Sequence, residues 1–222
     1  LDEDGPDIYE RYIVPAFSGA WAEDMVKRAK LKGGDRVLDV ACGTGIVSRR
    51  AYEVMGSRVH LTGVDVNEAV LEKGRDICTQ NDIPINFHQG SAGALPYDDV
   101  SVEVVLCQQG LQYFPDQGEA LADIRRVLVP GGRAVFSVWR PLEYSPFYHA
   151  LHRALERYVN ETAAGILAAA YSLGSHRELR ALFTSSGFEE IDIRLVIKQM
   201  HCPNIDNFLA AGISAAPFAK EE

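Results

Sequence analysis

Residues 36–45 read Arg36-Val-Leu-Asp-Val-Ala-Cys-Gly-Thr-Gly45, and the rest of the chain is organised around this stretch. Its first half is a compact apolar run, which is typical of a strand buried on both faces of a parallel sheet. Gly43 and Gly45 then allow a tight turn, and a helical pattern begins at Ile46. Such a turn brings a ligand to a helix N-terminus, where unpaired N–H groups favour a phosphate or a carboxylate. The stretch therefore predicts a site for a nucleotide-like cofactor.

Two acids narrow the class of cofactor. Asp39 stands at the end of the strand, where a buried anion would repel a pyrophosphate but suits an ammonium group. The third glycine of the dinucleotide pattern Gly-x-Gly-x-x-Gly is replaced by Ser48. Both observations argue against a dinucleotide. Asp65 ends a second apolar strand, residues 59–65, and its carboxylate is suited to accept both hydroxyls of a ribose.

Two strings in this region resemble a known family. Val37-Leu-Asp-Val-Ala-Cys-Gly-Thr-Gly45 and Gly63-Val-Asp-Val-Asn67 are similar to the first two motifs of class I S-adenosylmethionine-dependent methyltransferases, especially the small-molecule branch with the quinone-biosynthesis C-methyltransferases. The resemblance spans residues 36–139: residues 90–92 resemble the adenine-contacting motif, and residues 126–133 resemble the turn before the fifth strand. It implies S-adenosylmethionine as the cofactor and methyl transfer as the activity. The cofactor-binding residues that it implies are Asp39, Ala41, Gly43, Gly45, Asp65, Val66, Gly90, Ser91, Ala92, Gln108 and Gln109.

Two positions depart from the family pattern. Ala41 stands where many members carry glycine, and its added methyl group predicts a slightly different approach to the methionine moiety. Ser91 stands where an acid often holds the adenine amino group, so that contact is not expected from a carboxylate here.

Composition limits the number of domains, the partners and the cellular location that are consistent with the sequence. With 222 residues, 47% hydrophobic and 24% charged, the chain is long enough for one α/β core with an appended lid. A net charge of −9 argues against nucleic acid as a partner. The four cysteines form no Cys-x-x-Cys pair, which predicts neither a zinc site nor disulfides, and no metal is expected. No apolar run approaches the length of a membrane span, and the acidic N-terminus does not resemble a signal peptide. We expect a cytoplasmic enzyme.

The alternation of strand and helix patterns predicts the fold. Strand patterns at 37–40, 59–65, 85–88, 102–107 and 133–139 are separated by helical patterns, which indicates a doubly wound, mainly parallel sheet of the Rossmann-like methyltransferase type. Ligands of such sheets lie beyond the carboxyl ends of the strands, where the strand order reverses. The residues that fall at such ends, within reach of one ligand, are Asp39, Asp65, Ser91 and Gln108.

We expect a single methyltransferase domain over residues 1–222. It divides into N-terminal helices (7–32), a cofactor-binding core (33–139), a helical lid (140–186) and a C-terminal strand and tail (187–222). Alternating apolar residues from Phe188 to Gln199 predict a sixth strand, so the lid would be an insertion between strands five and six. The resembled fold ends with a seventh, antiparallel strand, and no such pattern follows Gln199, which makes the last part incomplete. A homodimer is one way to cover the open sheet edge.

Aromatic residues mark the candidate acceptor site. Tyr9, Tyr12, Phe17 and Trp21 either pack the N-terminal helices on the sheet edge or cover the methionine end of the cofactor. In the resembled family the lid selects the acceptor, which makes Trp139, Arg140, Tyr144, Phe147, Tyr148 and His149 candidates for substrate contact. Spacing marks out no general base, so the catalytic residue is left unassigned.

Three alternatives compete with methyl transfer. Asp39 and the missing third glycine disfavour a nucleotide-dependent oxidoreductase on a similar fold. An aminopropyl transferase usually needs an extra acid pair where this chain has Gln108-Gln109. A non-catalytic S-adenosylmethionine-binding protein stays open. The acidic charge and the aromatic-rich lid favour a small, partly apolar acceptor, such as a quinone precursor or a phenol.

Overall fold

The structure is a computed structural model of the chain, and it describes residues 5–202, 204–205 and 208. The strands are β1 (Arg36–Val40), β2 (His60–Asp65), β3 (Ile85–Gln89), β4 (Val102–Gln108) and β5 (Leu128–Ser137). The α- and π-helices are α1 (Gly5–Ile8), the π-helix η1 (Tyr9–Ser18), α2 (Gly19–Ala29), α3 (Ile46–Met55), α4 (Glu68–Gln80), α5 (Gln117–Val127), α6 (Pro146–Tyr158), α7 (Glu161–Ala169) and α8 (His176–Ser185). Short 3₁₀ turns are η2 (Gly56–Arg58), η3 (Leu111–Tyr113) and η4 (Leu142–Tyr144).

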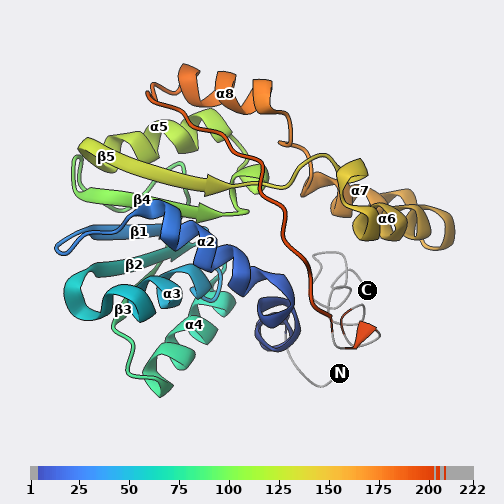
Figure 1. Cartoon of the computed structure of the whole chain (residues 1–222), viewed down its shortest axis with the longest axis horizontal. Coiled ribbons are helices and arrows are strands. Elements are labelled where there is room, and N and C mark those ends of the chain that lie inside the picture. The colour runs from blue at the N-terminus through green and yellow to red at the C-terminus, as the bar shows by residue number, and fades with distance from the viewer. Residues whose placement is uncertain (1–4, 203, 206–207, 209–222) are drawn as a thin grey trace.

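The five strands form one parallel sheet in the order β3-β2-β1-β4-β5 (Figure 1). Val37 of β1 lies opposite Leu61 of β2 on one side and Val104 of β4 on the other. The chain builds outward from β1 to β3 and then returns to place β4 beside β1, so the strand order reverses between β1 and β4. This topology confirms the doubly wound, Rossmann-like fold, and it places the expected ligand site at the carboxyl ends of β1 and β4.

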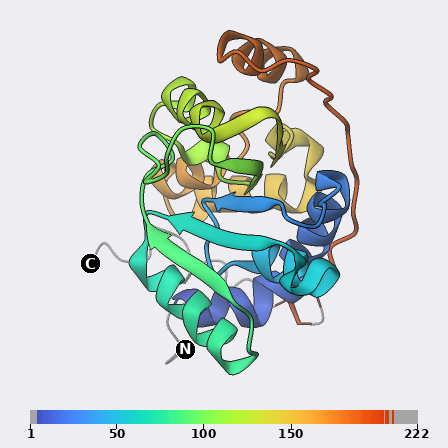
Figure 2. The same ribbon diagram turned by 90° about the vertical axis from the view of Figure 1, so that its left-hand side faces the viewer.

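Helices cover both faces of the sheet (Figure 2). Successive side chains of a strand point to opposite faces, so the apolar run of β1 supplies two cores. Val37 packs with α2 and α3, in a cluster that includes Met25 and Ala51. Leu38 and Val40 pack on the other face with α5, where Ile124 and Val127 are fully buried.

Two local features depend on particular residues. Asn67 caps α4, because its side chain accepts the N–H of Ala69. The chain stays helical through Pro15 in the π-helix η1, where the N–H of Gly19 donates to the carbonyl of Val14. The wider π turn accommodates a residue that has no N–H to donate.

The predicted sixth strand is wrong. The segment that follows α8 runs extended along the molecule, but residues 188–202 pair with no strand of the described chain (Figures 1 and 2). A strand requires a ladder partner for its N–H and carbonyl groups, and β5 offers its pairing only to β4. Leu195 and Ile197 consequently remain 61% and 83% exposed. The last part of the expected tail, residues 209–222, lies outside the described residues.

The region after β5 is helical, as expected for residues 140–186. Helices α6 and α7 form a pair that projects beyond the carboxyl end of the sheet, whereas α8 packs on α5 (Figure 1). Among the helices of the described chain, none is both long and apolar enough to span a bilayer.

Candidate active site

The turn after β1 is built from left-handed backbone. Ala41, Gly43 and Gly45 have φ angles of 56°, 54° and 80°. A Cβ atom on Gly45 would lie 2.7 Å from the Phe87 ring, so the turn is pressed onto β3 at that point. A Cβ atom on Gly43 would meet no described atom within 4 Å. The turn is thus packed against Phe87 at Gly45 and unobstructed at Gly43, which leaves room for a ligand to approach its backbone.

Asp65 links this turn to the neighbouring strands. Its Oδ2 accepts the N–H of Gly43 at 2.9 Å, and its Oδ1 accepts the N–H of Asn67 at 3.0 Å. Its carbonyl accepts the N–H of Gly90 at 3.0 Å, which ties the end of β2 to the end of β3. Each carboxylate oxygen has a further lone pair, so the half-buried side chain is able to accept two ligand hydroxyls while it holds the turn.

Asp39 lies beneath the turn and is 1% exposed. Its Oδ2 accepts two bonds from Ser48 of α3, from the N–H at 3.2 Å and from the hydroxyl at 2.8 Å. Its Oδ1, which we call the open oxygen, is buried and has no hydrogen-bond partner among the described residues. Burial raises the pKa of Asp39 to about 7; the Ser48 bonds oppose this shift, and the charge of Asp65 adds to it.

The carboxyl ends of β1, β2 and β4 form one edge of the sheet, which we call the rim. The end of β4 supplies side-chain amides to it. Gln108 donates its Nε2–H to the carbonyl of Ser18 at 3.1 Å, while its Oε1 is buried without a partner in the described ranges. Gln109 follows with a φ of 55°, and its N–H donates to the carbonyl of Ser137. A Cβ atom on Gly110 would lie 2.6 Å from the Cβ of Ala41, so the β4 turn touches the β1 turn.

The N-terminal helices close one side of the site. Glu10 of η1 accepts the Thr44 hydroxyl and, at 2.5 Å, the Arg49 guanidinium. Both side chains of the ion pair are largely buried. Asp7 forms a second ion pair with Lys73 of α4. These contacts and the bonds from Ser48 to Asp39 were not predicted from the sequence. The polar residue Thr44 within the glycine turn was the one sign that the turn would need a hydrogen-bond partner.

Aromatic side chains gather beside this rim. Trp139 follows β5, and its ring centroid lies 5.9 Å from that of Phe17 and 5.8 Å from that of Trp21. Burial raises the pKa of Tyr148 and Tyr171, so both phenols remain hydrogen-bond donors at neutral pH. We define the aromatic cluster by its ring contacts as Phe17, Trp21, Trp139, Phe147, Tyr148 and Tyr171.

Not every predicted residue lies at this centre. Val66 is 65% exposed, and the Ser91 side chain faces solvent beyond Gly90. Ala92 is buried in the core that contains Leu95. Of the predicted acceptor contacts, two lie elsewhere: the Arg140 guanidinium stacks on the Tyr144 ring at 3.5 Å, and both line a cavity of about 380 Å³ with Glu143 and His176.

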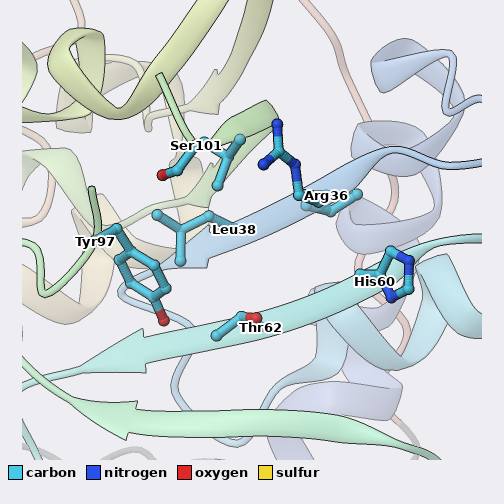
Figure 3. A pocket seen from close by; sticks show the side chains of 8 residues that line it. Arg36, Leu38, His60, Thr62, Tyr97 and Ser101 are labelled. Atoms are coloured by element: carbon cyan, nitrogen blue, oxygen red, sulfur yellow. The ribbon is translucent and has the colours of Figure 1, made fainter. Parts of the chain in front are cut away.

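A further cavity of about 250 Å³ lies away from the rim (Figure 3). It includes Arg36 and His60, the first residues of β1 and β2, whereas the site described above is formed by the last residues of the same strands. Leu38 and Tyr97 form its apolar wall.

Within the described ranges, no group of three His, Cys, Asp or Glu side chains is arranged to hold a metal ion.

Comparison with known proteins agrees with this geometry. Residues 31–185 match the family model described as "Methyltransferase domain". The demethylmenaquinone methyltransferase of Alkalihalophilus pseudofirmus is 29% identical over 84% of this chain and 86% of its own. The ubiquinone/menaquinone biosynthesis C-methyltransferase UbiE of Xylella fastidiosa is 32% identical over 79% of this chain and 74% of its own. Among solved structures, the YcgJ protein of Bacillus subtilis has a TM-score of 0.64 at 22% identity and covers 87% of this chain and 78% of its own.

The fold, the glycine turn and the two acids define a nucleoside-binding α/β enzyme, and the chain belongs to the class I S-adenosylmethionine-dependent methyltransferases. Its cofactor is S-adenosylmethionine, and it transfers a methyl group to a small molecule. Within that class it resembles the quinone-biosynthesis C-methyltransferases. The residues present fit this cofactor: the open oxygen of Asp39 and the Oε1 of Gln108 are buried acceptors that an ammonium group would satisfy.

Proposed function

We propose that the methyl acceptor is a small, planar, partly apolar molecule bound in the aromatic cluster. Support comes from one adjacency: Gln108 reaches the carbonyl of Ser18, and the neighbouring Phe17 packs edge-on against Trp139. The cofactor rim and the cluster therefore share the end of η1. Aromatic rings favour a flat apolar partner, and the phenols of Tyr148 and Tyr171 would donate to its oxygen atoms. Both curated relatives named above are quinone methyltransferases, which favours the same class of acceptor.

We assign the cofactor-binding residues as the sequence predicted them. Asp65 would hold the ribose hydroxyls, and Asp39 with Gln108 and Gln109 would face the methionine end. Ala41, Gly43 and Gly45 would line the turn. Residues 90–92 and Val66 would border the adenine, with backbone groups taking the place of the acid that Ser91 replaces.

The cofactor supplies a methyl group on a sulfonium centre, and the chain's part is to hold the acceptor in line with it. Positioning two reactants at about 3 to 3.5 Å, away from water, contributes several kcal/mol to lowering a barrier. The aromatic cluster would orient the acceptor plane, and Glu10 would keep η1 closed over the turn. A general base helps only when the acceptor must lose a proton, and no residue is assigned that role.

The cellular location, the domain organisation, the oligomeric state and the absence of a nucleic-acid partner are proposals as well. We place the enzyme in the cytoplasm, as one domain in which α6 and α7 act as the lid, with a homodimer as the arrangement that covers the sheet edge. The net charge of −9 supports the prediction that nucleic acid is not a partner.

Calorimetric titration tests the site first. S-adenosylhomocysteine should bind with micromolar affinity and NAD should not, and the reverse result would overturn the site.

An acceptor screen with quinones and phenols follows. Trp139→Ala should raise KM for the acceptor and leave S-adenosylhomocysteine affinity unchanged, whereas the control Tyr158→Ala, at a side chain 75% exposed at the end of α6, should change neither. Binding without turnover of any acceptor would favour a non-catalytic binding protein.

A further inference from the structure

We propose that Ser48 is a positioning residue that acts through Asp39, and that binding of the cofactor's ammonium group at Asp39 releases a proton near neutral pH. This inference rests on the proposed assignment of Asp39 to the methionine end of the cofactor. It gives Ser48, at the position of the third glycine in dinucleotide-binding turns, a role in charge control.

The geometry around Ser48 is specific. Ser48 is fully buried in the first turn of α3, and both its N–H and its hydroxyl donate to the same oxygen of Asp39. A carboxylate held at one oxygen by two donors has its plane and direction fixed. The open oxygen is then the one place, among the described contacts of Asp39, where a ligand donor would complete its hydrogen bonding.

The surroundings of Asp39 leave its charge poorly compensated. Asp65 at the end of β2 is a second acid that raises the pKa of Asp39, and burial raises it further. Burial also raises the pKa of the other titratable groups that interact with Asp39, so they are neutral near pH 7: Tyr9 of η1, Cys42 of the turn and Cys107 of β4. Ser48 therefore supplies the hydrogen bonds that favour the ionised form before the ligand arrives.

The proton balance follows from this state. In the free protein near pH 7, part of the population carries a proton on Asp39. When a ligand ammonium reaches the open oxygen, the O–H bond of the carboxyl group breaks, the carboxylate pairs with the ammonium, and the proton passes to solvent. Binding is then coupled to pH through one named group.

Calorimetry measures this release directly. We would titrate S-adenosylhomocysteine in phosphate and in Tris, whose ionisation enthalpies differ, between pH 6 and pH 9. The wild type should release about half a proton at pH 7, because the pKa of Asp39 is about 7, and this release should fall as pH rises above 7. Ser48→Ala should release more at pH 7 and bind roughly fivefold more weakly there, because a pKa one unit higher lowers the ionised fraction of Asp39 from about one half to about one tenth. Its deficit should shrink as pH rises, because both forms are then ionised.

Controls separate charge control from a structural role. Ser48→Thr keeps the hydroxyl and should restore the wild-type profile, and Ser57→Ala, at an exposed serine of η2, should match the wild type. A Ser48→Ala deficit that is the same at every pH, or wild-type binding without proton release, would overturn the inference and leave the cofactor site standing. Absence of S-adenosylhomocysteine binding would overturn the site itself. A carbon-13 titration of the Asp39 carboxyl in the free protein tests Ser48 without any ligand: an unchanged pKa in Ser48→Ala also overturns its role.

Discussion

The backbone N–H of Gly43 donates to Oδ2 of Asp65 at 2.9 Å, and this bond joins the turn after β1 to the end of β2. The other oxygen accepts the N–H of Asn67, at the start of α4. One side chain thus positions the turn and the next helix, and each of its oxygens keeps a lone pair that could accept a ribose hydroxyl. In the proposed assignment, the same carboxylate would carry both the ligand contact and the support of the turn.

Asp65→Ala should weaken binding of S-adenosylhomocysteine by about 1.5–3 kcal/mol, because hydrogen bonds to a charged acceptor are lost. Calorimetry would show this as a fall of roughly 10- to 150-fold in affinity. Asp76→Ala removes an exposed acid from the following helix α4 and serves as the control with an equal change of charge. Unchanged affinity in Asp65→Ala would place the ribose elsewhere.

Ala41 and Gly110 should behave as a coupled pair. Ala41 holds a φ of 56°, which costs a non-glycine residue about 1–2 kcal/mol, so Ala41→Gly should stabilise the folded state slightly or leave it unchanged. Gly110→Ala should destabilise it, because the new Cβ would lie 2.6 Å from that of Ala41.

The double variant tests the coupling. Removing the Ala41 methyl group makes room for the new one, so Ala41→Gly should recover part of the stability lost in Gly110→Ala. Urea unfolding of the four proteins gives the coupling energy. Strictly additive effects would show that the two turns do not touch.

Gly45→Ala should destabilise the protein more than Gly43→Ala. Both positions have positive φ, so an alanine would be strained at either one. At Gly45 the methyl group would also meet the Phe87 ring at 2.7 Å, which adds an overpacking cost of about 1–3 kcal/mol, whereas at Gly43 it would enter open space. Thermal unfolding compares the two. Equal losses would mean that Phe87 does not support the turn.

The parts of the fold that the sequence predicts well are those encoded within a short window. The strand, turn and helix at 36–55 depend on neighbours a few residues away, and each was confirmed. The cap of α4 at Asn67 is equally local. The doubly wound order follows from the alternation of such units. Asp39, Asp65 and Gln108 could be placed at one rim because parallel strands end on the same side.

What the sequence does not show are contacts between distant segments. The Glu10–Thr44 bond spans 34 residues, and no local pattern marks Glu10 as different from other helical acids. The segment after α8 illustrates the opposite error: its alternation satisfies the strand pattern, yet strand formation depends on a neighbour that the pattern does not contain. The role of Ser48 was hidden for the same reason, since its partner Asp39 lies across the turn.

Glu10→Ala should loosen η1 from the turn. The change removes the acceptor of Thr44 and Arg49 and leaves a largely buried guanidinium with one partner fewer, at an expected cost of about 1–3 kcal/mol in the free energy of unfolding. Hydrogen exchange in residues 9–18 should become faster. Glu23→Ala is the matched control, because its ion pair with Arg50 is long, 3.9 Å, and exposed. Exchange that stays as slow as in the wild type would show that other contacts hold η1.

Asp39→Asn should change how stability depends on pH. The pKa of Asp39 is about 7 in the folded protein and near 3.9 in an unfolded chain, so the folded state binds more protons between these values. The stability that Asp39 contributes is therefore complete below about pH 4 and declines, by at most about 1.4 kcal/mol per pH unit, until the pH passes 7. The amide that replaces the carboxyl group in the variant does not titrate.

The difference in unfolding free energy between the Asp39→Asn variant and the wild type should consequently shift in favour of the variant as pH rises from 5 to 7, and then level off above pH 8. Urea unfolding without ligand, at each pH unit, measures this difference. Asp76→Asn makes the same chemical change at an exposed position and serves as the control. A difference that stays constant with pH would mean that Asp39 is ionised throughout, and that its open oxygen is compensated by water or by a donor that moves.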